Sequence, residues 1–156
     1  MGNKMSSLKD ALNTAMKESM KSRDELRLST LRMVLSDIRK KDIDAEIAGK
    51  PLMDDAAVMS SLLTMVKQRR ESAASFTQAE RPELAQKELA EIAIIEGFLP
   101  KQLDQTAAQE KIKSIIVEIG AAGPKDMGRV MTEVKSRLAG QVDMSQVSGW
   151  VKSLLG

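Results

Sequence analysis

The chain has 156 residues, and its 24 Lys+Arg against 22 Asp+Glu give a formal net charge of only +2. Hydrophobic residues make up 42% and charged residues 29%, the ordinary balance of a soluble globular protein. Cysteine and histidine are absent, which excludes a disulfide framework, a thiolate metal site and the commonest general base. The aromatic residues Phe76, Phe98 and Trp150 are too few for a protein that recognises bases by stacking.

The sequence lacks the usual signals of membrane and secreted proteins. No run of about 18 apolar residues predicts a membrane span, and the N-terminus lacks the apolar core of a secretory signal. These features lead us to expect a cytoplasmic protein. The first residues, MGNKMS, fit the myristoylation pattern M-G-x-x-x-S. Because that pattern is short, a cloning remnant at residues 1–4 or a start at Met5 is favoured over lipidation.

Four helices are predicted in residues 1–98. The first spans residues 7–22 and the second residues 24–48, each with an apolar face at helical spacing. The third follows a cap at Asp54 or Asp55, and the fourth has Pro82 in its first turn. These segments predict one helical bundle. Its expected core includes Leu12, Leu31, Leu35, Ile38, Leu62, Met65, Ala85, Leu89, Ile92 and Ile95.

The segment GFLPKQLD, residues 97–104, marks the predicted domain boundary because it combines Gly and Pro with two apolar anchors. Three shorter helices are predicted in residues 99–156, with Asp104, Asp126 and Asp143 as their caps. No alternating β-branched run predicts a strand, so the fold class is all-α. Residues 99–156 carry 8 Lys+Arg against 6 Asp+Glu, so the net charge of +2 comes entirely from this part of the chain.

No group of residues has the pattern of a catalytic or metal site. Serines are common but no histidine can activate them, which leaves a Ser–Lys arrangement as the open alternative. The carboxylates at 54–55 and 42–46 are better explained as helix caps and solvated faces. The phosphate-binding pattern GxxxxGK[ST] has no match. We therefore expect no catalytic residue, no metal and no cofactor.

Two basic clusters lie on the predicted second and third helices. Residues 39–41 are late in their helix, where cations offset the helix dipole. Residues 67–70 are interleaved with Glu71, which favours a solvated face or an ion-pair network over a binding site.

A third cluster lies in the segment GPKDMGRVM, residues 123–131. At about 100° per residue, one face of this predicted helix is apolar. Lys125 and Arg129 fall on the opposite side, and Gly128 lies on a flank beside Thr132 and Lys135. The core face consists of Met127, Val130, Met131, Val134 and Leu138.

Glycine inside a helix costs about 1 kcal/mol relative to alanine, so Gly128 requires an explanation. Close approach of another helix at this flank is one explanation, and close approach of a phosphate backbone is the other. Spacing alone favours helix packing, and both explanations remain open.

Four segments in this order carry a family resemblance: LRMVLSDIR (31–39), QRRESAASF (68–76), RPELAQKELAEIAIIEGFLPKQL (81–103) and GPKDMGRVM. Together they resemble the YqeY-like proteins of the GatB/YqeY superfamily over nearly the entire chain. The resemblance implies an all-α fold, with an N-terminal bundle of about four helices (1–98) and a C-terminal three-helix module (99–156). It also implies similarity to the C-terminal region of the B subunit of tRNA-dependent amidotransferases.

Those amidotransferases convert glutamate or aspartate on a misacylated tRNA to the amide, with glutamine as the usual nitrogen donor. Their tail region engages the tRNA and lacks the active site. The resemblance therefore implies a non-catalytic tRNA-binding accessory module. Carbon–nitrogen ligase activity would be assigned to it only because related proteins in the family have that activity. Two alternatives stay open: an accessory subunit of a glutamine-dependent carbon–nitrogen ligase, and a helical protein–protein adaptor.

Carried onto this sequence, the resemblance places Lys125, Asp126, Gly128 and Arg129 at an RNA-facing surface, to which the helical wheel adds Lys135. It makes RNA approach at Gly128 about as favoured as helix packing. Asp126 is expected to cap the helix and leave the first amides free for phosphate. The segment DQTAAQEK after residue 103 departs from the pattern, because its acidic residue Glu110 comes late.

Overall fold

The computed structural model describes residues 7–156, so the MGNKMS pattern and the Met5 start lie outside the described residues. The predicted all-α fold class is confirmed: the described residues form seven α-helices and one short 3₁₀ helix, and they contain no strand. None of these helices is long and apolar enough to cross a membrane. The chain divides into two compact units, the first ending at Leu99 and the second spanning Pro100–Gly156.

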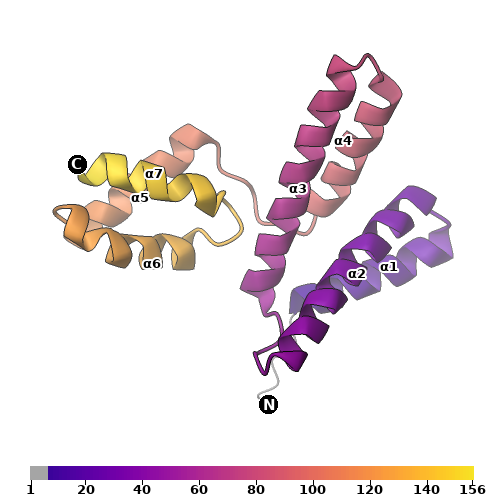
Figure 1. Ribbon diagram of the computed structural model, residues 1–156, viewed down its shortest axis with the longest axis horizontal. Coiled ribbons are helices and arrows are strands. Elements are labelled where there is room, and N and C mark those ends of the chain that lie inside the picture. The colour runs from indigo at the N-terminus through magenta and orange to yellow at the C-terminus, as the bar shows by residue number, and fades with distance from the viewer. Residues whose placement is uncertain (1–6) are drawn as a thin grey trace. The chain divides into compact units, whose positions relative to one another are not determined.

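The first unit consists of two helical hairpins (Figure 1). Its helices are α1 (Ser7–Ser22), α2 (Glu25–Ile47), α3 (Asp55–Gln78) and α4 (Pro82–Glu96). The caps are local: Asp24 Oδ1 accepts a hydrogen bond from Arg27 N at 3.2 Å, and Asp54 Oδ1 accepts one from Ala57 N at 2.9 Å. Each bond satisfies an amide that the first helical turn leaves unpaired.

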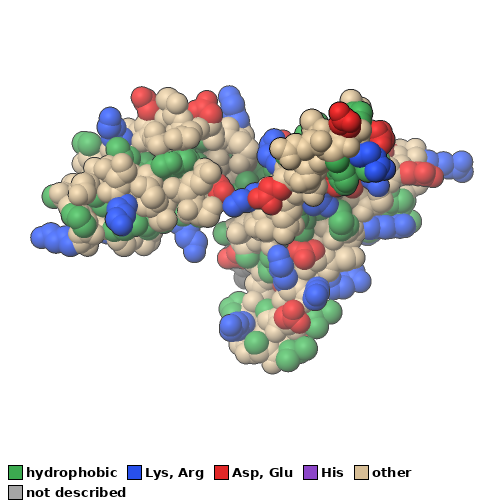
Figure 2. Space-filling view, turned by 45° about the horizontal axis from the view of Figure 1, so that its top comes forward, with side chains coloured by type: hydrophobic (Ala, Val, Ile, Leu, Met, Phe, Trp, Pro, Cys, Tyr) green, Lys and Arg blue, Asp and Glu red, His purple; other side chains and the backbone are tan. Residues whose placement is uncertain are grey.

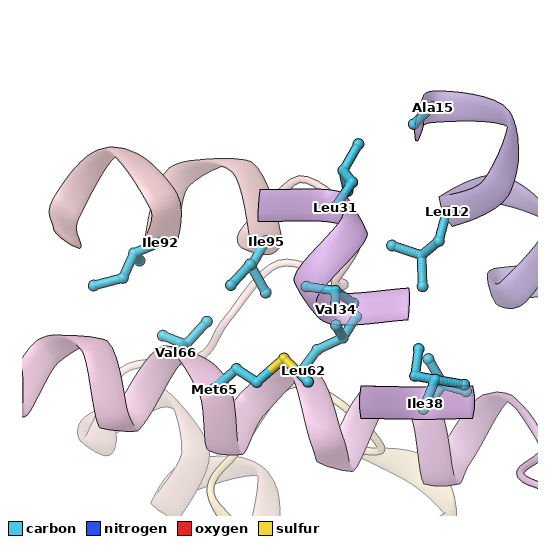
Figure 3. Close-up of a cluster of buried hydrophobic side chains, with 11 residues drawn as sticks. Leu12, Ala15, Leu31, Val34, Ile38, Leu62, Met65, Val66, Ile92 and Ile95 are labelled. Carbon is cyan, nitrogen blue, oxygen red and sulfur yellow. The ribbon is translucent and has the colours of Figure 1, made fainter. Parts of the chain in front are cut away.

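Apolar side chains from all four helices point toward one another in this unit (Figure 3). The fully or nearly fully buried ones are Leu12, Leu31, Val34, Ile38, Val58, Leu62, Met65, Val66, Ile92 and Ile95. Most of the predicted core positions are thus confirmed. Leu89 was predicted wrongly, because its side chain is 50% exposed.

Ion pairs connect the helices at the edge of this core. Arg69 Nε lies 3.5 Å from Glu91 Oε1 with both side chains largely buried, and Arg70 Nη2 lies 2.8 Å from Glu96 Oε2. The cluster at 67–70 is therefore part of an ion-pair network, as the sequence indicated, and its acidic partners come from α4.

Asp42 joins α1, α2 and the loop before α3. It accepts hydrogen bonds from Lys9 Nζ at 2.6 Å and from Met53 N at 2.7 Å. Burial raises the pKa of the Asp42 carboxyl, but these two hydrogen bonds and the charge of Lys9 outweigh burial, so the pKa lies below its ordinary value.

The second unit has its own core. Its elements are α5 (Gln105–Glu118), the 3₁₀ helix η1 (Pro124–Asp126), α6 (Met127–Arg137) and α7 (Met144–Leu155). Leu103 N donates a hydrogen bond to Gln141 O at 3.0 Å, which holds together the segments that lead into α5 and α7. The buried residues are Ala108, Ile112, Ile115, Val130, Val134, Leu138, Val142, Val147 and Val151.

A pair of leucine variants tests which side chains hold the first unit together. Leu62→Ala removes a fully buried side chain and should lower the free energy of unfolding by about 2–5 kcal/mol. Leu89→Ala makes the same chemical change at the half-exposed position, and its effect should stay below about 1 kcal/mol. Urea unfolding followed by circular dichroism measures both, and equal losses would contradict the assigned core.

Candidate nucleic-acid interface

One face of the helical segment from η1 through α6 is exposed and carries no acidic side chain. We call this surface the basic face; it consists of Lys125, Gly128, Arg129, Thr132, Lys135 and Ser136. The acidic residues of the segment, Asp126 and Glu133, are each half-buried. In Figure 2, Lys and Arg side chains stand separately over the visible surface of the second unit, at the left of the view.

The opposite side of the segment fixes its orientation. Val130 and Val134 are fully buried, Leu138 is buried beyond the end of α6, and Met127 and Met131 pack against the same core. This is the apolar face that the helical wheel predicted. The five candidate residues therefore lie off the core face, and four of them, all except Asp126, are exposed together.

Asp126 differs from its prediction as a helix cap. No cap hydrogen bond from its side chain reaches the first amides of α6, because the 3₁₀ turn η1 runs directly into this helix. The carboxylate reaches back instead, and its Oδ2 accepts a hydrogen bond from Ala122 N at 2.9 Å. This bond lowers the pKa of Asp126 below its ordinary value, with burial acting against it and the charges of Arg129 and Lys125 adding to it.

Arg129 also bonds the backbone of the preceding turn. Its Nη1 donates to Ile119 O at 3.1 Å, and its Nη2 lies 3.4 Å from Asp126 Oδ1. Ile119 is the C-cap residue directly after α5, so the guanidinium lies beside the negative end of that helix dipole. Asp126 and Arg129 therefore hold the turn between α5 and α6 from both sides, which gives each a structural role within the chain.

Gly128 faces open space. A Cβ built on this residue would have no heavy atom outside its own helical surroundings within 4 Å, and its φ lies outside the left-handed region. Neither a tight packing contact nor an unusual backbone angle in the described structure explains the glycine. Of the two explanations for Gly128, packing of a neighbouring helix and approach of a phosphate backbone, the described structure shows no helix packed at this position.

Lys125 and Lys135 are the cations of the basic face that form no direct ion pair with a described residue, although the charge of Lys125 also acts on nearby Asp126. Both are exposed, and neither forms an ion pair among the described residues. Their net charge is therefore available to an external anion. Arg137 differs, because Glu118 Oε2 and Glu133 Oε2 both bind its guanidinium, and these contacts raise its pKa.

Two polar residues of the face were missed as candidates by reasoning from the motif. Thr132 and Ser136 follow Gly128 at intervals of four, so all three lie on one line along α6. Thr132 Oγ1 donates to Gly128 O at 3.0 Å. A count of exposed positions on the helical wheel would have found both residues, because four-residue spacing is visible in the sequence.

Nothing in the described part of the chain resembles a metal site, since no group of three His, Cys, Asp or Glu side chains is arranged to hold an ion. Shallow hollows occur in the first unit. One lies among α2, α3 and α4 and includes Met33, Phe76 and Leu84, and its charged residues Arg69 and Glu91 already pair with each other.

Gly128→Ala tests whether the glycine has a function inside the isolated chain. Since nothing lies near the new methyl group, the variant should raise the stability of the second unit by about 0.5–1 kcal/mol. Trp150 is the only tryptophan and packs on the core of this unit, so its fluorescence during urea unfolding reports the change. A loss of stability would reveal an internal contact at Gly128.

Acid titration tests the contacts of Asp126. Its pKa is depressed in the folded chain, so its stabilising contribution is present above the unfolded value near 4 and is lost as pH falls through the folded value. The hydrogen bond from Arg137 lowers the pKa of Glu118 as well, so Glu118 also loses its stabilising contribution as pH falls. Asp126→Asn should therefore reduce the acid-induced loss of stability reported by Trp150, and Glu118→Gln should remove a separate part. An unchanged pH profile in both variants would contradict these contacts.

Comparison with known proteins gives this chain a family. The sequence model described as Yqey-like protein matches residues 9–155. "Altered inheritance of mitochondria protein 41, mitochondrial" of Pyrenophora tritici-repentis is 27% identical over 148 residues, which cover 93% of this chain and 79% of that protein. The protein of the same name from Lachancea thermotolerans is 33% identical over 116 residues, covering 72% of this chain and 60% of the relative.

A third relative of that name, from Kluyveromyces lactis, is 32% identical over 112 residues, covering 70% of this chain and 56% of the relative. The chain thus spans less than two thirds of two of these three proteins. All three names place the relatives in mitochondria, so the expectation of a cytoplasmic location is contradicted. That expectation rested on missing sequence signals, and a missing signal is weak evidence about a compartment. The match over residues 9–155 shows that the chain belongs to the YqeY-like family.

Proposed function

We propose that the chain is a non-catalytic accessory module that binds tRNA, or another structured RNA, through the basic face. The observation that carries this proposal is the composition of that face: every residue on it is cationic or small and neutral, and all are exposed. The similarity to the amidotransferase tail, drawn from the sequence motifs, supplies the class of RNA.

Lys125 and Lys135 would supply the electrostatic part of the binding. Cations without a protein counter-ion can neutralise phosphates and release the ions condensed on the RNA, which favours association at low salt. The two lysines lie ten residues apart along the segment, about 15–16 Å at the rises of the short 3₁₀ turn and of the α-helix. They would therefore contact separate phosphates.

The line of Gly128, Thr132 and Ser136 would let the RNA approach the helix closely. Glycine presents no side chain, and the two hydroxyls can hydrogen-bond to phosphate or to ribose 2′-hydroxyl groups. The few aromatic residues argue against recognition of unstacked bases. Recognition of a folded shape through its backbone agrees better with this inventory.

A charge-reversal pair tests the electrostatic part. Lys125→Glu with Lys135→Glu should weaken tRNA binding at least about tenfold and reduce the salt dependence by about 2 in log–log slope, one for each phosphate that the variant no longer neutralises. Arg129 is unsuitable because it also holds the turn between α5 and α6. Fluorescence titration of labelled tRNA at several salt concentrations provides the measurement.

The matched control is Lys111→Glu with Lys113→Glu, which makes the same charge change at exposed positions of α5. It should reduce binding much less than the change on the basic face. Equal losses would show non-specific attraction, and no binding by the wild-type chain at low salt would refute the proposal.

Substitutions at Gly128 test the close approach. Gly128→Leu should weaken tRNA binding, whereas the same variant should remain folded because the space around Gly128 is open. If RNA binding is unaffected and a protein partner that survives RNase depends on Gly128, the adaptor alternative is favoured instead.

A further inference from the structure

Thr132 lies at the centre of the basic face. Four other members of the face flank it on a helical wheel, each within about 60°: Gly128 and Lys135 on one side, and Arg129 and Ser136 on the other. Thr132 is exposed, and side chains of an α-helix lean toward its N-terminus, so its hydroxyl lies over the turn that contains Gly128. Because glycine adds no side chain there and the space around it is open, a ligand can reach this hydroxyl directly.

The hydroxyl of Thr132 already donates its proton within the helix. Its Oγ1 lies 3.0 Å from Gly128 O, and a carbonyl oxygen can only accept, so the hydroxyl proton lies in this bond. The lone pairs of Oγ1 are therefore what the side chain presents to the outside. The centre of the basic face thus offers a hydrogen-bond acceptor, although the lysines around it attract anions.

An acceptor among cations discriminates between the groups of a polyanion. The oxygens of a phosphodiester have no proton to donate, so they can pair with a lysine but not with Thr132 Oγ1. A ribose 2′-hydroxyl can donate as well as accept, and it is the group that distinguishes RNA from DNA. A ligand that carries phosphates for the lysines and a hydroxyl donor for Thr132 therefore matches the whole face.

Double-helical RNA presents these two groups close together. Its minor groove is wide and shallow and displays the 2′-hydroxyls, whereas its major groove is too deep and narrow for side chains to read. The small residues along the middle of the basic face suit a shallow surface of this kind. Lys125 and Lys135 lie toward the two ends of that line, where they can contact the phosphates on either side.

We propose that Thr132 is a specificity-determining residue of the basic face, which accepts a hydrogen bond from a ribose 2′-hydroxyl in the minor groove of an RNA double helix. This inference rests on the proposed RNA binding and adds the class of RNA, which is base-paired and A-form. The lysines supply affinity through phosphates, which RNA and DNA share. Thr132 supplies the preference for ribose.

A comparison of two sugars tests the proposal by fluorescence titration at one low salt concentration. The ligands are labelled hairpins of one sequence, one with natural ribose and one with 2′-fluoro sugars, which keep the A-form but cannot donate a hydrogen bond. The wild-type chain should bind the natural hairpin about two- to tenfold more tightly, the ratio that one net hydrogen bond gives. Thr132→Val keeps the shape and removes the acceptor, so it should abolish this ratio, whereas Thr132→Ser should retain it.

Thr106→Val is the matched control, because Thr106 is exposed on α5, outside the basic face. It should leave the ratio unchanged. The salt dependence of binding should be equal for the wild type and Thr132→Val, since both carry the same charges.

Two results would overturn the role of Thr132 while RNA binding itself persists: equal affinity of the wild-type chain for both hairpins, and a ratio that survives Thr132→Val. If the wild-type chain binds neither hairpin at low salt, the proposed RNA binding fails, and this inference fails with it.

Discussion

The basic face depends on the contacts that close the turn between α5 and α6. Asp126 accepts a hydrogen bond from Ala122 N, and Arg129 donates one to Ile119 O, so each charged side chain bonds the backbone on the far side of the turn. Together they fix where α6 begins and how it is rotated. The buried Val130 and Val134 then hold the opposite side of the helix in the core.

This arrangement separates two roles within one motif. Asp126 and Arg129 stabilise the fold, because their charged side chains form hydrogen bonds with the backbone of the turn. Lys125 forms no ion pair among the described residues, and a side chain at Gly128 would meet no other described part of the chain. No neighbouring element packs on the position that a Gly128 side chain would occupy, so a glycine that lowers helix stability is better explained there by what approaches from outside. This favours the RNA proposal over internal packing.

The surfaces of α2 and α6 differ in the chemistry that they offer. The end of α2 combines exposed isoleucines with side chains of both charge signs. The basic face has cations, hydroxyls and a glycine without exposed apolar groups, which suits a solvated polyanion.

Most of the helices could be predicted from sequence because their signals are local. Asp54 caps α3 through an amide three residues away, and Pro82 begins α4, so neighbouring residues suffice to define these ends. The apolar periodicity likewise determined which side of α6 faces the core. Local signals failed at Asp126, because a 3₁₀ turn precedes the helix and redirects the carboxylate to Ala122.

The sequence by itself determined the all-helical class, most helix ends and the separation of the basic face from its apolar side, since these follow from spacing along one helix. Only the tertiary structure decided that Leu62 is buried and Leu89 half-exposed, although both occupy apolar positions at helical spacing. It also decided that Arg129 bonds Ile119 while Lys125 has no ion pair in the described chain. Burial and pairing depend on which elements meet in space, and helical periodicity carries no information about the partner.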